Sequence, residues 1–75
     1  MKILSSKLIM PGEQLLIYKI ENNSVQAGFN DEQAEVHEIT VRQDGRKQFQ
    51  KECMTFILNG AEITEVLLEN GPYKE

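Results

Sequence analysis

A chain of 75 residues has room for one domain, and no linker-like stretch divides residues 1–75. Hydrophobic residues make up 40% of the chain and charged residues 27%, which is ordinary for a globular protein and argues against disorder along the whole length. The net charge of −4 argues against non-specific binding to nucleic acids or anionic membranes. A core this small is marginal, so we expect the protein to gain stability by forming a homo-oligomer.

The single cysteine excludes an internal disulfide and favours a reducing compartment. Ser5, Ser6 and Lys7 interrupt the apolar start of the chain before it reaches the length of a signal-peptide core, and no run approaches transmembrane length. We therefore expect a cytoplasmic protein with no membrane contact. Its size and acidity are also typical of phage and prophage accessory proteins, although this similarity of composition points to no specific role.

The first two predicted strands cover residues 2–10 and 13–20. Between them, Pro11-Gly12 has the residue order of a type II turn, because proline presets φ at the second turn position and glycine adopts φ > 0 at the third. A two-residue loop here would place Leu8 opposite Leu15. The second strand is apolar on both faces, which predicts an interior strand covered on both sides or one that meets a second subunit.

The middle of the chain has weaker patterns. Residues 25–29 are predicted to form a short strand, or a loop that tucks Phe29 into the core. The polar stretch 31–38 favours one short helix with a capping residue at its start. Residues 36–41 then have the composition of a strand, with Ile39 on its apolar side.

Asp44-Gly45 marks the next turn, and the apolar register selects the loop length. A three-residue loop over 43–45 places Ile39 opposite Phe49, whereas a two-residue loop would leave it opposite Gln50. The longer loop is a type I turn followed by a G1 bulge, with the glycine in the left-handed conformation. We therefore predict the three-residue loop.

Asn59-Gly60 between two apolar runs is the strongest hairpin signal in the chain. A two-residue type I′ loop would place Phe56 opposite Ile63 and would leave one face of the hairpin entirely apolar. Upstream, the apolar positions change parity. A single strand over 46–58 would therefore have to bend near residues 51–53.

A helical alternative stays open for 46–68. Four residues have the spacing of a helix face, and Gly60 could end such a helix: Phe49, Cys53, Phe56 and Ile57. Against a helix, residues 55–57 favour a strand, and Arg46 and Lys47 would place positive charge at a helix N-terminus. The strand interpretation is preferred.

The predicted fold class is all-β, or β-rich α+β. We expect a small antiparallel meander of five to six strands, barrel- or sandwich-like, ending with a strand over 61–68 and carrying the possible short helix near 31–38. The sequence has no internal repeat and no low-complexity tract.

No enzyme activity, cofactor or metal site is expected. His37 is the only histidine and could act as a general base. No hydroxyl nucleophile stands at a recognisable motif, however, and most lone histidines are surface residues without a catalytic role.

Cys53 lies between Glu52 and Met54, which disfavours the thiolate and predicts a buried structural thiol. The acidic residues lack EF-hand spacing and are read as a solvated face: Asp31, Glu32, Glu35 and Glu38.

The leading hypothesis is a non-enzymatic protein-binding module that self-associates through an apolar sheet face or a free sheet edge. The candidate partner-binding residues combine a second apolar face with an acidic rim: Leu16, Tyr18, Ile20, Asp31, Glu32 and Glu35. Two alternatives stay open. One is a small β-barrel that binds nucleic acid through a basic cluster, namely Arg42, Arg46, Lys47 and Lys51, although exposed aromatics are missing from that cluster. The other is an acidic inhibitor of a basic host protein.

Overall fold

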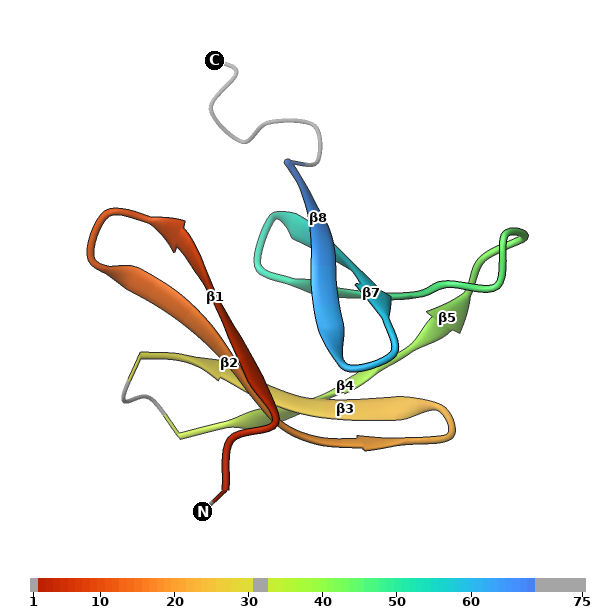
Figure 1. The fold of residues 1–75 in the computed structure, drawn as a ribbon, viewed down its shortest axis with the longest axis horizontal. Coiled ribbons are helices and arrows are strands. Elements are labelled where there is room, and N and C mark those ends of the chain that lie inside the picture. The colour runs from red at the N-terminus through yellow and green to blue at the C-terminus, as the bar shows by residue number, and fades with distance from the viewer. Residues whose placement is uncertain (1, 31–32, 69–75) are drawn as a thin grey trace.

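The computed structural model describes residues 2–30 and 33–68 (Figure 1). The described chain contains no helix and eight strands: β1 (Ser5–Met10), β2 (Glu13–Glu21), β3 (Ser24–Phe29), β4 (Glu35–Glu38), β5 (Thr40–Val41), β6 (Lys47–Lys51), β7 (Met54–Asn59) and β8 (Glu62–Leu68). Strands β1 to β4 form one antiparallel sheet and β5 to β8 a second, each in sequence order. The all-β class is confirmed. The predicted count of five to six strands is wrong, because two predicted long strands are each divided in two.

Both sheets contribute side chains to one core. Its buried members are Leu15, Ile17, Val25, Ala27 and Phe29 from the first sheet, Ile39 from the crossing, and Phe49, Met54, Phe56, Leu58 and Ile63 from the second sheet. The ring of Phe49 stacks on Phe56 with centroids 5.2 Å apart and packs against His37 at 5.5 Å. Phe29 meets Phe56 edge-on at 6.4 Å, so three phenylalanines join the two sheets.

The β1–β2 hairpin has the predicted turn with a different register. Gly12 has a φ of 80°, as the third position of a type II turn requires. Met10 pairs with Glu13 and Leu8 with Gln14, so Ile9 is an extra residue that forms a bulge in β1. The predicted pair of Leu8 and Leu15 is therefore wrong.

A second bulge changes the apolar face of β2. The β2–β3 register shifts between Ile17 and Lys19, which leaves Tyr18 as the extra residue. Beyond the bulge the alternation is reversed, and Ile20 packs against the core. Leu16 and Tyr18 are half-buried, so the outer face of β2 is only partly covered.

The predicted helix near 31–38 is wrong where the structure describes it, because Glu35–Glu38 is β4 and pairs with β3. Residues 31 and 32 lie outside the described part. Asn30 has a φ of 50° and ends β3 without capping a helix. Its backbone N–H donates to the Gln14 carbonyl, and its Oδ1 accepts from the Gln14 N–H, both at 2.8 Å. Phe29 is buried, as predicted.

The chain crosses from one sheet to the other at Ile39 (Figure 1). The predicted single strand over 36–41 is divided there into β4, which pairs with β3, and β5, which pairs with β6. The Ile39 N–H donates to the Asn23 carbonyl at 3.0 Å, and the side chain is buried in the core. The predicted three-residue loop that follows is confirmed, since Arg42 N–H bonds to the Arg46 carbonyl and Gly45 has a φ of 87°.

Residues 46–68 form strands, so the helical alternative is excluded. Lys51 pairs with Met54, and a tight turn at Glu52-Cys53 replaces the predicted bend in one long strand. Glu52 has a φ of 59°, in the left-handed region that favours glycine. Cys53 is half-buried in this turn, which corrects the prediction of a buried thiol within a strand.

The β7–β8 hairpin is present, but its loop is Gly60-Ala61. Asn59 pairs with Glu62, so Gly60 takes the first loop position, with a φ of 66°. A type II′ turn requires φ > 0 only at that position, whereas the predicted type I′ turn requires it at both. A bulge at Thr64 then places Phe56 opposite Val66, so the predicted Phe56–Ile63 pair is wrong.

Candidate functional site

The described members of the predicted partner-binding set lie in different surroundings. Leu16 and Tyr18 lie half-buried on β2, whereas Ile20 packs against the core. Glu35 is exposed on β4, where its carboxylate pairs with Lys51. Asp31 and Glu32 lie outside the described residues.

Two residues of the predicted basic cluster share one counter-charge, the carboxylate of Asp44 in the β5–β6 loop. Arg46 Nη2 lies 3.1 Å from Asp44 Oδ2, and Arg42 Nε lies 3.6 Å from Asp44 Oδ1. The Arg46 backbone N–H, helped by the Arg46 side chain, lowers the pKa of the Asp44 carboxyl group. Arg42 also donates to Gln48 Oε1 at 3.0 Å. The two arginines thus stabilise the loop.

The other two cations of that cluster point inward from opposite ends of β6. Lys47 and Lys51 have the same parity as the buried Phe49 and pair with the buried residues Leu58 and Met54. The sequence contained this signal, because the alternation Lys47, Phe49, Lys51 follows the period of a strand. In the predicted basic cluster, the two lysines were instead grouped with Arg42 and Arg46.

Lys51 is 5% exposed, and neighbouring groups compensate its charge. Its Nζ lies 3.3 Å from Glu35 Oε1 and 5.0 Å from the centroid of the Phe29 ring. The carboxylate and the negative face of the ring both compensate the desolvated ammonium group. Since Glu35 comes from β4 and Lys51 from β6, this contact links the two sheets.

His37 lies beside that ion pair, with its side chain 13% exposed. Burial lowers the pKa of His37, and the positive charge of Lys51 lowers it further, while Glu35 acts in the opposite direction. Nε2 lies 3.8 Å from Glu35 Oε1 and has no hydrogen-bond partner. These surroundings favour a neutral imidazole packed on Phe49.

A polar hollow of about 270 Å³ opens next to the histidine, lined by His37, Glu38, Thr40, Gln48, Phe49 and Gln50. Its only hydroxyl among these is that of Thr40. A nucleophile needs a hydrogen bond to its base, and the structure gives none between Thr40 and His37 in the described residues.

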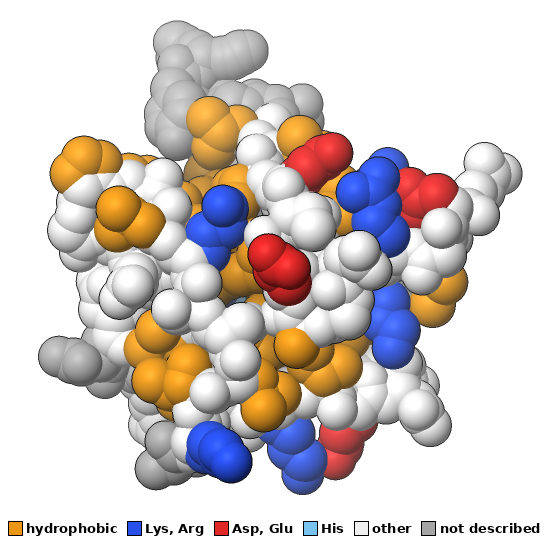
Figure 2. Space-filling model, in the orientation of Figure 1, with side chains coloured by type: hydrophobic (Ala, Val, Ile, Leu, Met, Phe, Trp, Pro, Cys, Tyr) orange, Lys and Arg blue, Asp and Glu red, His pale blue; other side chains and the backbone are white. Residues whose placement is uncertain are grey.

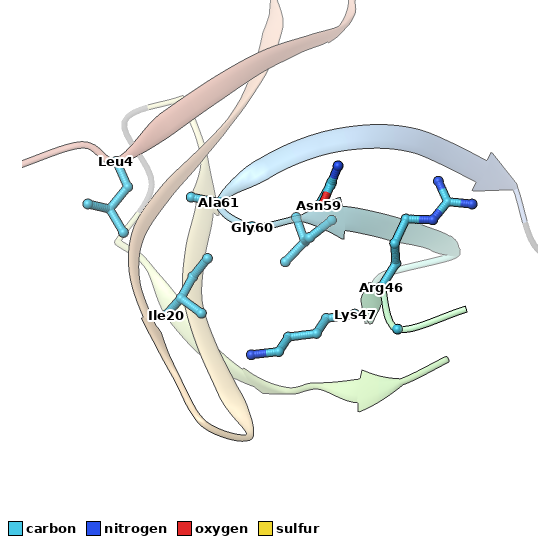
Figure 3. A pocket seen from close by; sticks show the side chains of 9 residues that line it. Leu4, Ile20, Arg46, Lys47, Asn59, Gly60 and Ala61 are labelled. Atoms are coloured by element: carbon cyan, nitrogen blue, oxygen red, sulfur yellow. The ribbon is translucent and has the colours of Figure 1, made fainter. Parts of the chain in front are cut away.

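A second hollow, of about 250 Å³, lies at the Lys47 end of β6 (Figure 3). It is lined by Leu4, Ile20, Gly45, Arg46, Lys47, Leu58, Asn59, Gly60 and Ala61. The lining therefore joins the segment before β1, strand β2 and two turns of the second sheet. The walls of this site come from four separate segments, so no local sequence pattern predicts it.

Exposed large hydrophobic side chains lie only on edge strands or next to one, within the described chain. They are Ile3 and Leu4 before β1, Leu8 and Met10 on β1, Val36 on β4, Val41 on β5, and Leu67 and Leu68 on β8. On the face seen in Figure 2, hydrophobic side chains form several patches separated by polar and charged groups. No interior strand exposes a large hydrophobic side chain in this way.

The described residues contain no group of three or more side chains suited to hold a metal ion, and no helix among them is long and apolar enough to cross a bilayer. Comparison with protein-family models, curated proteins and solved structures finds no match to this chain.

Proposed function

We propose that the protein is a small non-enzymatic protein-binding module that self-associates through its two long edge strands, β1 and β8. The main support for this proposal is that the exposed large hydrophobic side chains of the described chain lie on or beside edge strands. Soluble proteins usually protect a free sheet edge with charges, short length or a covering segment. An apolar edge is therefore a surface that a partner would cover.

The two long edges meet at one end and diverge toward the other (Figure 1). Near the meeting point, the Ser5 hydroxyl donates to the Ala61 carbonyl. Farther along, three uncharged residues follow on each strand, over 8–10 of β1 and 66–68 of β8. No ladder joins β1 to β8, so each of the two strands has one edge that no other described strand covers.

A strand from a second copy could add to either free edge through main-chain hydrogen bonds. Its apolar side chains would then cover Leu8 and Met10, or Leu67 and Leu68. Leu16 extends this surface on the first sheet, because it lies directly opposite Ser6 of β1. The short edges β4 and β5 offer much less length for such pairing.

Sedimentation velocity over a wide concentration range tests the proposal. We expect a dimer or larger species, and we expect Leu8→Lys and Leu67→Lys to weaken association by about tenfold or more, since each places a charge in the covered strip. Gln43→Lys adds the same charge on the exposed β5–β6 loop and should leave association unchanged. A monomer at every concentration would contradict self-association, and equal effects of all three substitutions would contradict the edge as its site.

A further inference from the structure

The hollow at the Lys47 end of β6 combines apolar walls with one inward-pointing cation. Leu4, Ile20 and Leu58 supply the larger apolar side chains of the lining. The Lys47 side chain extends across the opening toward Ile20, whereas Arg46 extends away from it (Figure 3). Arg46 Nη2 also pairs with Asp44 Oδ2 at 3.1 Å. Lys47 is therefore the cation available to a ligand in the hollow.

Lys47 has no intramolecular counter-charge in the part of the chain that the structure describes. No acidic side chain there lies within ion-pair distance of its Nζ, although the residue is half-buried. The equivalent lysine at the other end of the strand, Lys51, has both Glu35 and the Phe29 ring. An ammonium group without a counter-charge beside apolar walls can take an external anion as its partner.

We propose that this hollow binds a small organic monocarboxylate. Its carboxylate would pair with Lys47, and its apolar group would lie among Leu4, Ile20 and Leu58. The volume of about 250 Å³ exceeds the ~150 Å³ of a protein cavity that takes up benzene, so one ring or a short chain with a carboxylate fits. A single available cation and mostly aliphatic walls favour one negative charge over the multiple charges of a phosphate group.

This site is separate from the surface proposed for self-association. Ala61 lines the hollow and also accepts the Ser5 hydrogen bond, so the hollow lies where β1 and β8 meet. The apolar strips over 8–10 and 66–68 lie at the diverging ends of the same strands. Ligand binding and association can therefore be measured, and can fail, independently.

The experiment is an amide NMR titration of the intact chain with benzoate as the probe. We expect saturable shifts at Lys47, Leu58 and Gly60, with a dissociation constant on the order of a millimolar for so small a ligand. Benzyl alcohol keeps the ring without the charge, and acetate keeps the charge without the ring. Each should bind at least about tenfold more weakly.

Lys47→Gln should weaken benzoate binding by about tenfold or more, and Lys47→Arg should retain most of it. Lys7→Gln is the matched control, because it removes one positive charge from the exposed β1 strand. Ala61→Leu keeps Lys47 but fills part of the hollow, and it should also weaken binding. The proposal is overturned if benzoate causes no saturable shift at these residues, or if Lys47→Gln and Lys7→Gln have equal effects. Unchanged binding in Ala61→Leu would also overturn it, because the ring would then lie outside the hollow.

Discussion

The two ends of β6 show two ways to accommodate an inward-pointing lysine. At one end Lys51 is almost fully buried, and Glu35 and the Phe29 ring compensate its charge. At the other end Lys47 is half-buried beside a hollow of about 250 Å³. At the first end the lysine is packed into the protein and its charge is compensated. The second has space and a charge that no described acidic side chain compensates.

The difference separates a structural role from a binding role for the same residue type. A buried lysine with its own carboxylate and ring holds two sheets together, and a ligand there would have to displace those contacts. A lysine beside an open apolar hollow can instead bind an external anion. Substitutions at matched positions of the two ends can therefore break or sharpen the contrast.

The largest effect is expected between the two ends, at Phe49. This ring stacks on Phe56 and packs against His37, and it is 2% exposed. Phe49→Ala should lower the free energy of unfolding by about 3–5 kcal/mol, because it leaves a cavity between the sheets. Urea unfolding followed by circular dichroism measures the loss. Phe49→Leu keeps most of the volume, and a loss as large as that of the alanine variant would contradict the cavity explanation.

The next effect concerns the charge pair at the filled end. Glu35→Gln leaves the Lys51 ammonium group buried without its carboxylate, and should cost about 1 kcal/mol, since the exposed Glu35 side chain limits the strength of the pair. Lys51→Met removes the charge and keeps an unbranched apolar chain, so its own effect should stay within about 1 kcal/mol of zero. In the Lys51→Met background, Glu35→Gln should cost almost nothing. Urea unfolding of the four proteins measures this coupling.

Lys47→Met is the matched substitution at the open end. It should change the free energy of unfolding by less than about 0.5 kcal/mol, and this small effect should not depend on Glu35. Coupling of Lys47 to Glu35 as strong as that of Lys51 would remove the distinction between the two ends.

The tight turns beside the two ends of β6 also differ, because one has glutamate and the other glycine at a positive φ. Substitutions there should change the free energy of unfolding by about 1 kcal/mol or less. Glu52 follows Lys51 with a φ of 59°, and Gly60 lines the hollow with a φ of 66°. Glu52→Gly should stabilise the fold by about 0.5–1 kcal/mol, because it relieves a left-handed conformation in a residue with a side chain. Gly60→Ala should cost about 1 kcal/mol for conformation alone, since an added Cβ meets no atom within 4 Å. Thermal unfolding tests both, and opposite signs are required.

The sequence was sufficient for features that depend on neighbouring residues. The type II turn at Pro11-Gly12 and the three-residue loop ending at Gly45 follow from the conformations that proline and glycine favour. The all-β class follows from the same turns and the short apolar runs between them. Bulges at Ile9, Tyr18 and Thr64 were not predicted, because each adds one residue without a distinctive composition.

The candidate site was harder to predict because its contacts connect distant segments. The parity of Lys47 and Lys51 with Phe49 indicated that both lysines point inward. The partner of Lys51 depends on where the chain crosses between sheets at Ile39, since that crossing brings Glu35 to β6. No local pattern specifies such a crossing, so the sequence alone could not separate the filled end from the open one.

The finest test of the contrast is the pKa of His37, which can be followed cleanly because the chain contains one histidine. Burial and the charge of Lys51 hold this pKa below 6.5 in the folded protein, while Glu35 opposes them. Because the folded pKa lies below the unfolded one, the stability contributed by neutral His37 is present in full above pH 6.5. It is lost as the pH falls from there through the folded pKa.

NMR titration of the imidazole protons should show that Lys51→Met raises the pKa of His37, since it removes a nearby positive charge. Glu35→Gln should lower this pKa by removing the opposing negative charge. Lys47→Gln removes the same charge as Lys51→Met from the same strand, at the end away from the histidine, and should leave the pKa unchanged. An equal rise in both lysine variants would mean that the histidine senses only net charge. A rise confined to Lys51→Met would show that the two ends of β6 are electrostatically separate, as independent structural and binding roles require.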